Sequence, residues 1–181
     1  MLTPVDGLSL SVPAHWMACD EASNAKLASA PDRRALAPKF CGTQNATSFG
    51  AFDPEPLHPA AIYAGREPQN AITEGVILRM SEANLVTMGQ NVCPVLEKPF
   101  VDAHAVIASC VLKREAIAGH PALVFRIVSA PSEEPAAQSE LEAWAIATPR
   151  GVVDFNVVWP VYAKDKVQPM LQAIRDSLQL Q

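Results

Sequence analysis

The stretch that most constrains the fold runs from Glu140 to Leu180, where two strand patterns joined by a turn lead into a helix pattern. In the turn, Pro149 sets φ for the second position and Gly151 tolerates the positive φ needed on leaving it. The strand after the turn has one wholly apolar face, made by Val153, Phe155, Val157 and Trp159. The helix has an apolar stripe, made by Val167, Met170, Leu171, Ile174 and Leu178. We therefore predict that the helix packs on that strand face.

Several upstream segments read as strands of a larger antiparallel sheet that begins at Leu8. Alternation from Leu8 to Val12 predicts a strand that Pro13 stops. The further predicted strands are 47–52, 60–64 and 72–80, and a hairpin of 106–112 and 123–128 turns at 118–121. A polar, acidic loop is expected from Ser129 to Gln138.

Two helices are predicted before the hairpin. A short one is expected from Asp20 to Ala30, where alanine is frequent. A longer one is expected from Glu82, because Ser81 is a favourable N-cap residue, and Pro99 is expected to end it. Its apolar face is made by Leu85, Met88, Val92 and Leu96.

Length and charge limit the function classes. The chain has 181 residues, of which 49% are apolar, so one substantial core and a single domain spanning 1–181 are expected. The net charge is −5 and the basic residues are scattered, which argues against a nucleic-acid partner. No apolar run approaches the roughly 20 residues that span a bilayer, so membrane insertion is not expected. The first ten residues lack a secretory-signal pattern, which fits a cytoplasmic protein and equally a chain whose signal has been removed.

The four cysteines, Cys19, Cys41, Cys93 and Cys110, contain no Cys-x-x-Cys spacing. Their even number is compatible with two structural disulfides, which would indicate an oxidising, extracytoplasmic compartment. Of three possible pairings we favour Cys19 with Cys41 and Cys93 with Cys110, because each closes a short loop. Each bridge would contribute roughly 3 kcal/mol in the chain-entropy model. Four buried free thiols are the alternative.

A search for catalytic motifs finds none of the esterase, Walker, zincin or dinucleotide-binding patterns, so neither catalytic residues nor a cofactor is expected. The four histidines, His15, His58, His104 and His120, do not pair with each other or with a cysteine at helical spacing, so no metal site is expected. A nucleophile pair of Cys110 with His104 or His120 is retained for an enzymatic alternative.

Of the three tryptophans, Trp16 and Trp159 are expected in the core. Trp144 shares a strand face with Glu142, Ile146 and Thr148. That face could be covered by the helix of Leu85 to Leu96 or left open, which makes Trp144 a candidate contact for a protein partner.

Three segments carry a resemblance to a known family. They are Gly7 to Pro13 followed by Trp16, Ile117 to Pro121 followed by Leu123 to Ile127, and the closing hairpin and helix that end in Ile174-Arg175-Asp176-Ser177-Leu178. In these segments the chain resembles the PsbP-like superfamily, which includes photosystem PsbP, the Ran-binding Mog protein and bacterial DcrB-like and secretion-associated proteins. The four cysteines and the proline-rich segment 53–68 depart from the family pattern.

The resemblance implies an α+β fold, an antiparallel sheet flanked by helices as an α/β/α sandwich, and binding or assembly roles without common catalytic residues. We therefore expect a non-enzymatic, periplasmic or otherwise extracytoplasmic protein that binds another protein, with toxin immunity or secretion as candidate processes. The alternatives are a cytoplasmic effector chaperone of a secretion system and a hydrolase or redox enzyme with a Cys/His site. The binding function is expected around Trp144 or in the loops at 53–70 and 129–139.

Overall fold

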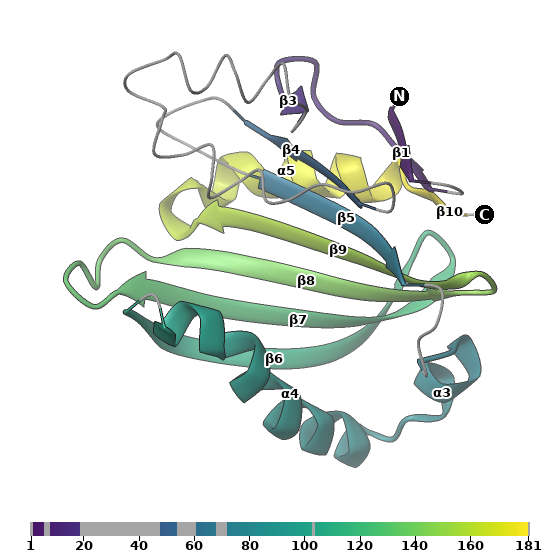
Figure 1. The fold of residues 1–181 in the computed structure, drawn as a ribbon, viewed down its shortest axis with the longest axis horizontal. Coiled ribbons are helices and arrows are strands. Elements are labelled where there is room, and N and C mark those ends of the chain that lie inside the picture. Colours follow the sequence, from purple (N-terminus) through teal and green to yellow (C-terminus); the bar gives the residue numbers. More distant parts are fainter. Residues whose placement is uncertain are drawn as a thin grey trace.

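The computed structural model of the chain describes residues 2–5, 8–18, 48–53, 61–67, 72–102 and 104–180. Two predictions, the helix at 20–30 and the Cys19–Cys41 disulfide, lie outside these ranges. The described strands form a seven-stranded antiparallel sheet in the order β3-β4-β5-β9-β8-β7-β6 (Figure 1). Their bounds are β3 Met17–Ala18, β4 Ser48–Phe52, β5 Ala61–Glu67, β6 Ala105–Ile117, β7 His120–Pro131, β8 Ser139–Thr148 and β9 Gly151–Pro160. The predicted α+β class is confirmed.

A second, three-stranded sheet brings the two ends of the chain together (Figure 1). Its strands are β1 (Leu2–Val5), β2 (Leu8–Leu10) and β10 (Gln179–Leu180). The prediction that the strand at Leu8 begins the main sheet was therefore wrong. The strand β2 pairs instead with β10, which follows the C-terminal helix, and Leu180 lies opposite Leu8. The Ser11 amide also donates to Ser177 Oγ at 2.8 Å.

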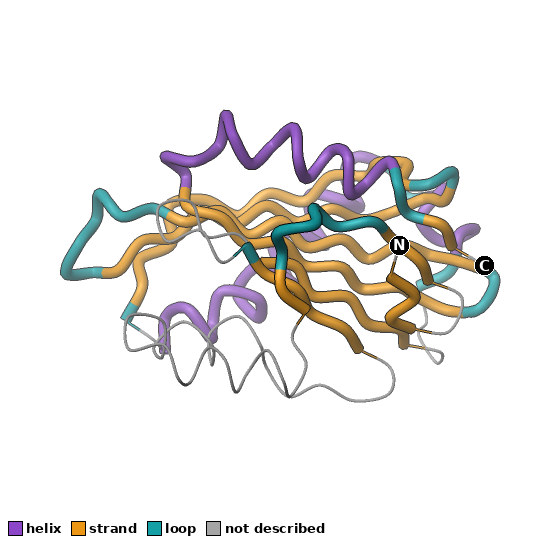
Figure 2. Tube along the Cα trace, turned by 90° about the horizontal axis from the view of Figure 1, so that it is seen from above, coloured by secondary structure: helices purple, strands orange, loops and turns teal. Residues whose placement is uncertain are grey.

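Helices cover both sides of the main sheet (Figure 2). The 3-10 turn η1 (Val161–Ala163) leads into α5 (Lys164–Asp176), whose buried residues share one core with the apolar face of β9. This confirms the predicted packing of the C-terminal helix. On the opposite side lie α3 (Glu74–Arg79) and α4 (Glu82–Asp102). The core beneath them contains Ile77, Leu85, Leu123, Phe125 and Ala147.

Segment 72–80, predicted to be a strand, contains α3 instead. Thr73 caps this helix, because its side-chain oxygen accepts a hydrogen bond from the Val76 amide at 3.4 Å. The contiguous apolar run resembled a buried strand, yet only one face of it is covered: Ile77 is fully buried, whereas Leu78 is 64% exposed. That asymmetry is typical of a helix lying on a surface.

The helix α4 begins where predicted, with the Asn84 amide donating to Ser81 Oγ at 3.2 Å. It does not end at Pro99 but continues to Asp102, and an ion pair of 2.7 Å between Lys98 and Asp102 spans its last turn. The predicted end at Pro99 was therefore wrong. A proline destabilises the interior of a helix, but a helix can still continue past it. None of the helices in the described ranges is both long and apolar enough to cross a membrane.

The two hairpins around which the main sheet is built form as predicted. Strands β6 and β7 are joined by Ala118 and Gly119, with φ of 50° and 82°. Positive φ at both central residues matches the right-handed twist of a two-residue hairpin. Strands β8 and β9 are joined by Pro149 and Arg150, and Gly151 adopts the predicted positive φ, here 113°.

Candidate functional site

A groove of about 490 Å³ lies between α5 and the main sheet. Its floor comes from β7, β8 and β9, and its wall comes from α5. The lining residues are Arg126, Glu142, Trp144, Trp159, Asp165, Gln168, Pro169, Leu171, Gln172 and Arg175. We call this the α5 groove. Its volume lies within the range of about 300–1,000 Å³ that is common for ligand sites.

A chain of ion pairs fixes the floor of the α5 groove. Arg126 lies directly opposite Glu142 on the neighbouring strand, and its Nε donates to Glu142 Oε2 at 2.6 Å. The Arg126 Nη2 atom lies 3.4 Å from Glu115 Oε1 on β6. From α5, Arg175 Nη2 donates to the other Glu115 oxygen at 2.6 Å. The chain of ion pairs thereby links α5 to β6, β7 and β8, and two arginines are held in fixed positions.

The charge state of Arg126 follows from these contacts. Partial burial alone would lower its pKa, because it disfavours the charged form. The hydrogen bond to Glu142 and the charges of Glu142, Glu115 and Glu140 oppose that effect, and the net result raises the pKa of Arg126 above its ordinary value. The folded state therefore retains a guanidinium at neutral pH.

Trp144 lies at the centre of this network. Its ring stacks on Phe155 with centroids 4.7 Å apart, and the Arg175 guanidinium lies 5.3 Å from its ring centroid. Its indole N–H donates to Glu142 Oε1 at 2.6 Å. Trp144 is only 3% exposed, so the open sheet face expected around it does not exist. The covering helix is α5 and not the helix of Leu85 to Leu96, since Trp144 pairs with Phe155 and must share its face.

Trp159, predicted to be in the core, is 2% exposed and forms another part of the groove floor. Its indole N–H has no hydrogen-bond partner among the described residues. A buried donor without a partner is uncommon in a folded protein.

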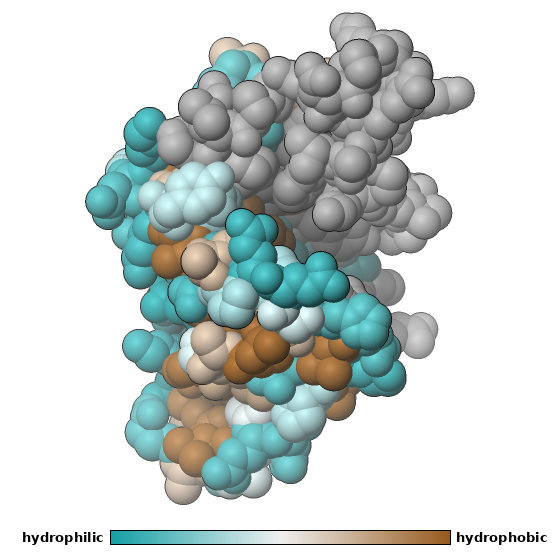
Figure 3. All heavy atoms as spheres, turned by 90° about the vertical axis from the view of Figure 1, so that its left-hand side faces the viewer, coloured by the Kyte–Doolittle hydropathy of each residue, from teal (hydrophilic) through white to brown (hydrophobic). Residues whose placement is uncertain are grey.

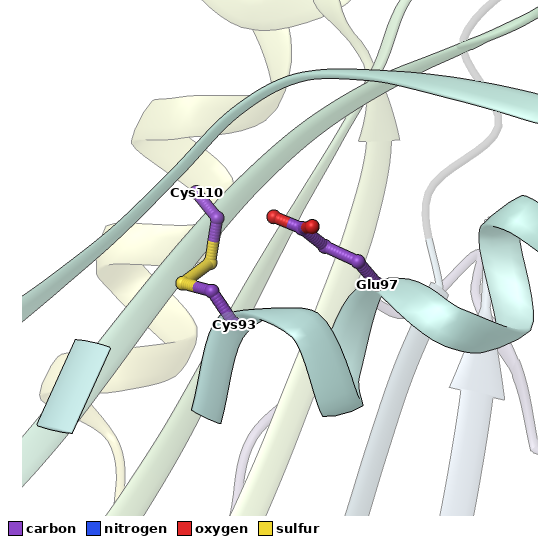
Figure 4. A group of neighbouring side chains, drawn as sticks. All are labelled: Cys93, Glu97 and Cys110. Atoms are coloured by element: carbon purple, nitrogen blue, oxygen red, sulfur yellow. A yellow bond between two sulfur atoms is a disulfide. The ribbon is translucent and has the colours of Figure 1, made fainter. Parts of the chain in front are cut away.

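A second group of reactive side chains lies on the opposite side of the sheet. Cys93 on α4 and Cys110 on β6 form a disulfide with Cα atoms 6.0 Å apart, the second of the two pairings favoured from the sequence. The Glu97 carboxylate points toward this disulfide (Figure 4). The predicted alternative, in which Cys110 and a histidine form a nucleophile pair, was wrong because the Cys110 sulfur is bonded to Cys93.

The histidines of the described segments are dispersed. His120 Nδ1 lies 2.8 Å from Glu74 Oε1 and so links the β6–β7 hairpin to α3. His15 Nε2 lies 3.5 Å from Asp53 Oδ2. His104 is exposed beside the start of β6. These three histidines therefore do not form a cluster, and His58 lies outside the described residues.

Sequence reasoning missed the chain of ion pairs at the α5 groove, which is formed by Glu115, Arg126, Glu142 and Arg175. One signal was available. A two-residue turn at 118–119 sets the register of β6 against β7, pairing Val111 with Arg126, so Glu115 and Arg126 had to share a face. The longer loop between β7 and β8 leaves the pairing of Arg126 with Glu142 undetermined until the fold is known.

Searches with the whole chain find similar solved structures. The solution structure of cyanobacterial PsbP (CyanoP) from Synechocystis sp. PCC 6803 has a TM-score of 0.55 and 9% identity, covering 97% of this chain and 88% of that one. The crystal structure of LpqN, involved in cell envelope biogenesis of Mycobacterium tuberculosis, has a TM-score of 0.49 and 9% identity over 96% and 82% of the two chains. No protein-family model and no curated protein sequence matches the chain. At such low identity the likeness to PsbP establishes the fold alone, and the fold is PsbP-like, as the resemblance implied.

Proposed function

We propose that this chain is a single non-enzymatic domain that works outside the cytoplasm and binds another protein through the α5 groove. A role in secretion or toxin immunity would fit such a module. The main support for the proposal is an open groove in which Arg126, held by Glu142 and 38% exposed, lies beside the polar side chains of the α5 wall. Arginine is, with tryptophan and tyrosine, enriched among the residues that dominate protein–protein binding.

The chemistry of the groove favours a polar polypeptide segment as the ligand. Asp165, Gln168 and Gln172 are exposed along the α5 wall, and they offer both donors and acceptors. The Arg126 side chain is 38% exposed, so one face of its guanidinium remains reachable while Glu142 holds the other. A purely apolar ligand would desolvate these groups without replacing their hydrogen bonds, which is unfavourable.

The same residues argue against catalysis in this groove. The Glu142 carboxylate is occupied by Arg126 and by the Trp144 indole, so it is poorly placed to act as a general acid or base. The described groove lining contains no serine, cysteine or histidine that could act as a nucleophile with an adjacent base. Fixed charges around an aromatic floor suit recognition better than bond cleavage.

The Cys93–Cys110 disulfide supports an extracytoplasmic location, because structural disulfides persist mainly in oxidising compartments. We expect protein isolated from its native host, with thiols blocked during lysis, to resist alkylation at Cys93 and Cys110 until a reductant is added. Peptide mass spectrometry measures this directly. Alkylation of both residues without reductant would contradict the proposed compartment and favour the cytoplasmic chaperone.

The binding proposal is tested with a Gln168→Arg variant, which places a long charged side chain into the α5 groove. A partner captured from the native organism by wild-type protein should bind this variant at least about tenfold more weakly, because the ligand must displace the new side chain. Isothermal titration calorimetry with the purified partner gives the two dissociation constants.

The matched control is Asn91→Arg, which adds the same side chain to an exposed position of α4 on the other side of the sheet. This variant should bind like the wild type. Equal affinity of all three proteins would exclude the groove as the binding site. If only Asn91→Arg bound the partner more weakly, the binding site would lie on α4 and not in the α5 groove.

Exposed apolar side chains on α4 and β6 favour the alternative function, a cytoplasmic effector chaperone. Several valines there are 45–68% exposed, namely Val86, Val95, Val101, Val106 and Val111. Such side chains could contact an amphipathic helix. However, in the end-on view of Figure 3 the hydrophobic groups of the described surface are interrupted by hydrophilic ones. A mixed surface of this kind is a less favourable docking site for an apolar helix face than a continuous apolar groove.

A further inference from the structure

We propose that reduction of the Cys93–Cys110 disulfide creates a Zn²⁺ site formed by the two thiolates and Glu97. The disulfide would then act as a redox-controlled closure of a metal site at the junction of α4 and β6. This inference concerns the opposite side of the sheet from the α5 groove, and it does not depend on the proposed binding function.

The three side chains already converge on one point. The sulfur atoms of Cys93 and Cys110 and a carboxylate oxygen of Glu97 all lie within 4.8 Å of one another. Cys93 and Glu97 are four residues apart on α4, which puts them on the same face of the helix. Cys110 approaches from β6 and completes the triangle (Figure 4). Two elements of the fold therefore hold the three groups together even when the sulfur–sulfur bond is absent.

The donor set matches the preferences of zinc. Zn²⁺ binds thiolate sulfur at about 2.3 Å and carboxylate oxygen at about 2.0–2.2 Å, with tetrahedral geometry. Two sulfurs on one tetrahedral zinc are then about 3.8 Å apart. After reduction, the sulfur atoms of Cys93 and Cys110 need only move apart to about this distance. The distance is compatible with the present cluster, in which all ligand atoms lie within 4.8 Å of one another. Soft thiolate ligands also disfavour Mg²⁺ and Ca²⁺, which prefer oxygen donors.

The surroundings leave room for a fourth ligand. A groove of about 330 Å³ adjoins the disulfide, lined by Cys93, Glu97 and Cys110 together with Gln90 and apolar residues of α4 and β6. A water molecule or the Gln90 side chain could occupy the remaining tetrahedral position. Cys110 and Glu97 are partly exposed whereas Cys93 is 8% exposed, so a reductant would reach the bond from the Cys110 side.

Reduction and reoxidation of the disulfide are each two-electron steps. A dithiol reductant transfers two electrons and two protons to the disulfide, which becomes two thiols while the dithiol becomes a disulfide. Zn²⁺ then replaces the two thiol protons, which are released to solvent, and the Glu97 carboxylate binds as it is. In reoxidation by a disulfide oxidant, the two thiolates lose two electrons and form the Cys93–Cys110 bond, the oxidant takes up these electrons and two protons from solvent to become two thiols, and Zn²⁺ is released.

No metal site was expected from the sequence, because the histidines do not pair with each other or with a cysteine at helical spacing. The relevant signal was the Cys-x-x-x-Glu spacing within a helix pattern, Cys93 and Glu97. By itself that spacing is too common to identify a site. The third ligand comes from β6, and its position depends on how α4 packs across the sheet.

The test is a zinc titration of the full-length protein, reduced with a phosphine and competed against a chromophoric chelator. We expect one Zn²⁺ bound by the reduced wild type in addition to any bound by a Cys93→Ser/Cys110→Ser variant. That variant retains Cys19 and Cys41 and so reports their binding separately. Oxidised wild type should bind no zinc at this site.

Glu97→Gln should lower the zinc affinity at least about tenfold, since it replaces a charged ligand with a neutral amide. The matched control is Glu82→Gln, on the same helix but 87% exposed and outside the cluster, which should leave the affinity unchanged. Zinc should also raise the melting temperature of the reduced wild type more than that of the double serine variant. The proposal is overturned if reduced wild type binds no more zinc than the serine variant, or if Glu97→Gln binds as tightly as Glu82→Gln.

Discussion

Replacing Phe155 with alanine is expected to lower the free energy of unfolding by about 3–5 kcal/mol. Phe155 is fully buried in the middle of the main sheet and belongs to the core that α5 covers. It also stacks on Trp144, with ring planes inclined by 12°. Alanine would remove the ring contacts and leave a cavity that the two packed layers cannot readily fill. Urea denaturation followed by circular dichroism measures the loss.

Two further variants define the cause. Phe155→Leu retains much of the buried volume and should cost clearly less than Phe155→Ala. Val86→Ala removes an apolar side chain that is 60% exposed on α4 and should change stability by no more than about 0.5 kcal/mol. If Phe155→Ala were as mild as Val86→Ala, the close packing of α5 on β9 would be incorrect.

The Phe155 layer was predictable because the information is local. Alternation in β9 and the helical spacing in α5 each define an apolar face. Because the connection between the two elements is short, these two faces are expected to pack against each other. The hairpin turns were predictable for the same reason, since Gly119 and Gly151 supply positive φ where the chain reverses.

The surroundings of Trp144 were also predictable from local information, yet the open face expected there was wrong. With Pro149 and Arg150 as the turn, Thr148 pairs with Gly151, and counting back along both strands pairs Trp144 with Phe155. The pair had to share the face under α5. The polar neighbours Glu142 and Thr148 suggested an open face, whereas Glu142 is buried because Arg126 and the Trp144 indole satisfy its carboxylate.

The remaining misses depended on contacts distant in sequence. The strand at Leu8 left the main sheet because β10 pairs with it from the other end of the chain. The helix α3 is an exception, because the error there was local: three consecutive apolar residues were read as a strand, and Thr73 was not considered as an N-cap. Arg175 could be assigned to the last turn of a helix, but its ion pair with Glu115 on β6 is separated by sixty residues. No local pattern reports such a contact.

A second large loss of stability is expected when the chain of ion pairs at the α5 groove is broken. Arg126→Met should lower the free energy of unfolding by about 2–3 kcal/mol, mainly because it leaves Glu142 without its charged partner. Breaking a fully buried ion pair costs about 3–5 kcal/mol. A smaller value is expected here since the Arg126 side chain is 38% exposed and water can partly replace it. Methionine preserves most of the side-chain volume, so little of the loss would come from packing.

A double-mutant cycle with Glu142→Gln separates the charge effect from the rest. Glutamine keeps an oxygen that can accept from the Trp144 indole but carries no charge, and Arg126 retains Glu115 at 3.4 Å. Glu142→Gln alone should therefore cost only about 1 kcal/mol. In the double variant no unpaired carboxylate is left, so the combined loss should be smaller than the sum of the single losses by about 1–2 kcal/mol. Additive losses would mean that Arg126 and Glu142 do not stabilise each other, and the floor of the α5 groove would then lack the rigidity on which the proposed binding function depends.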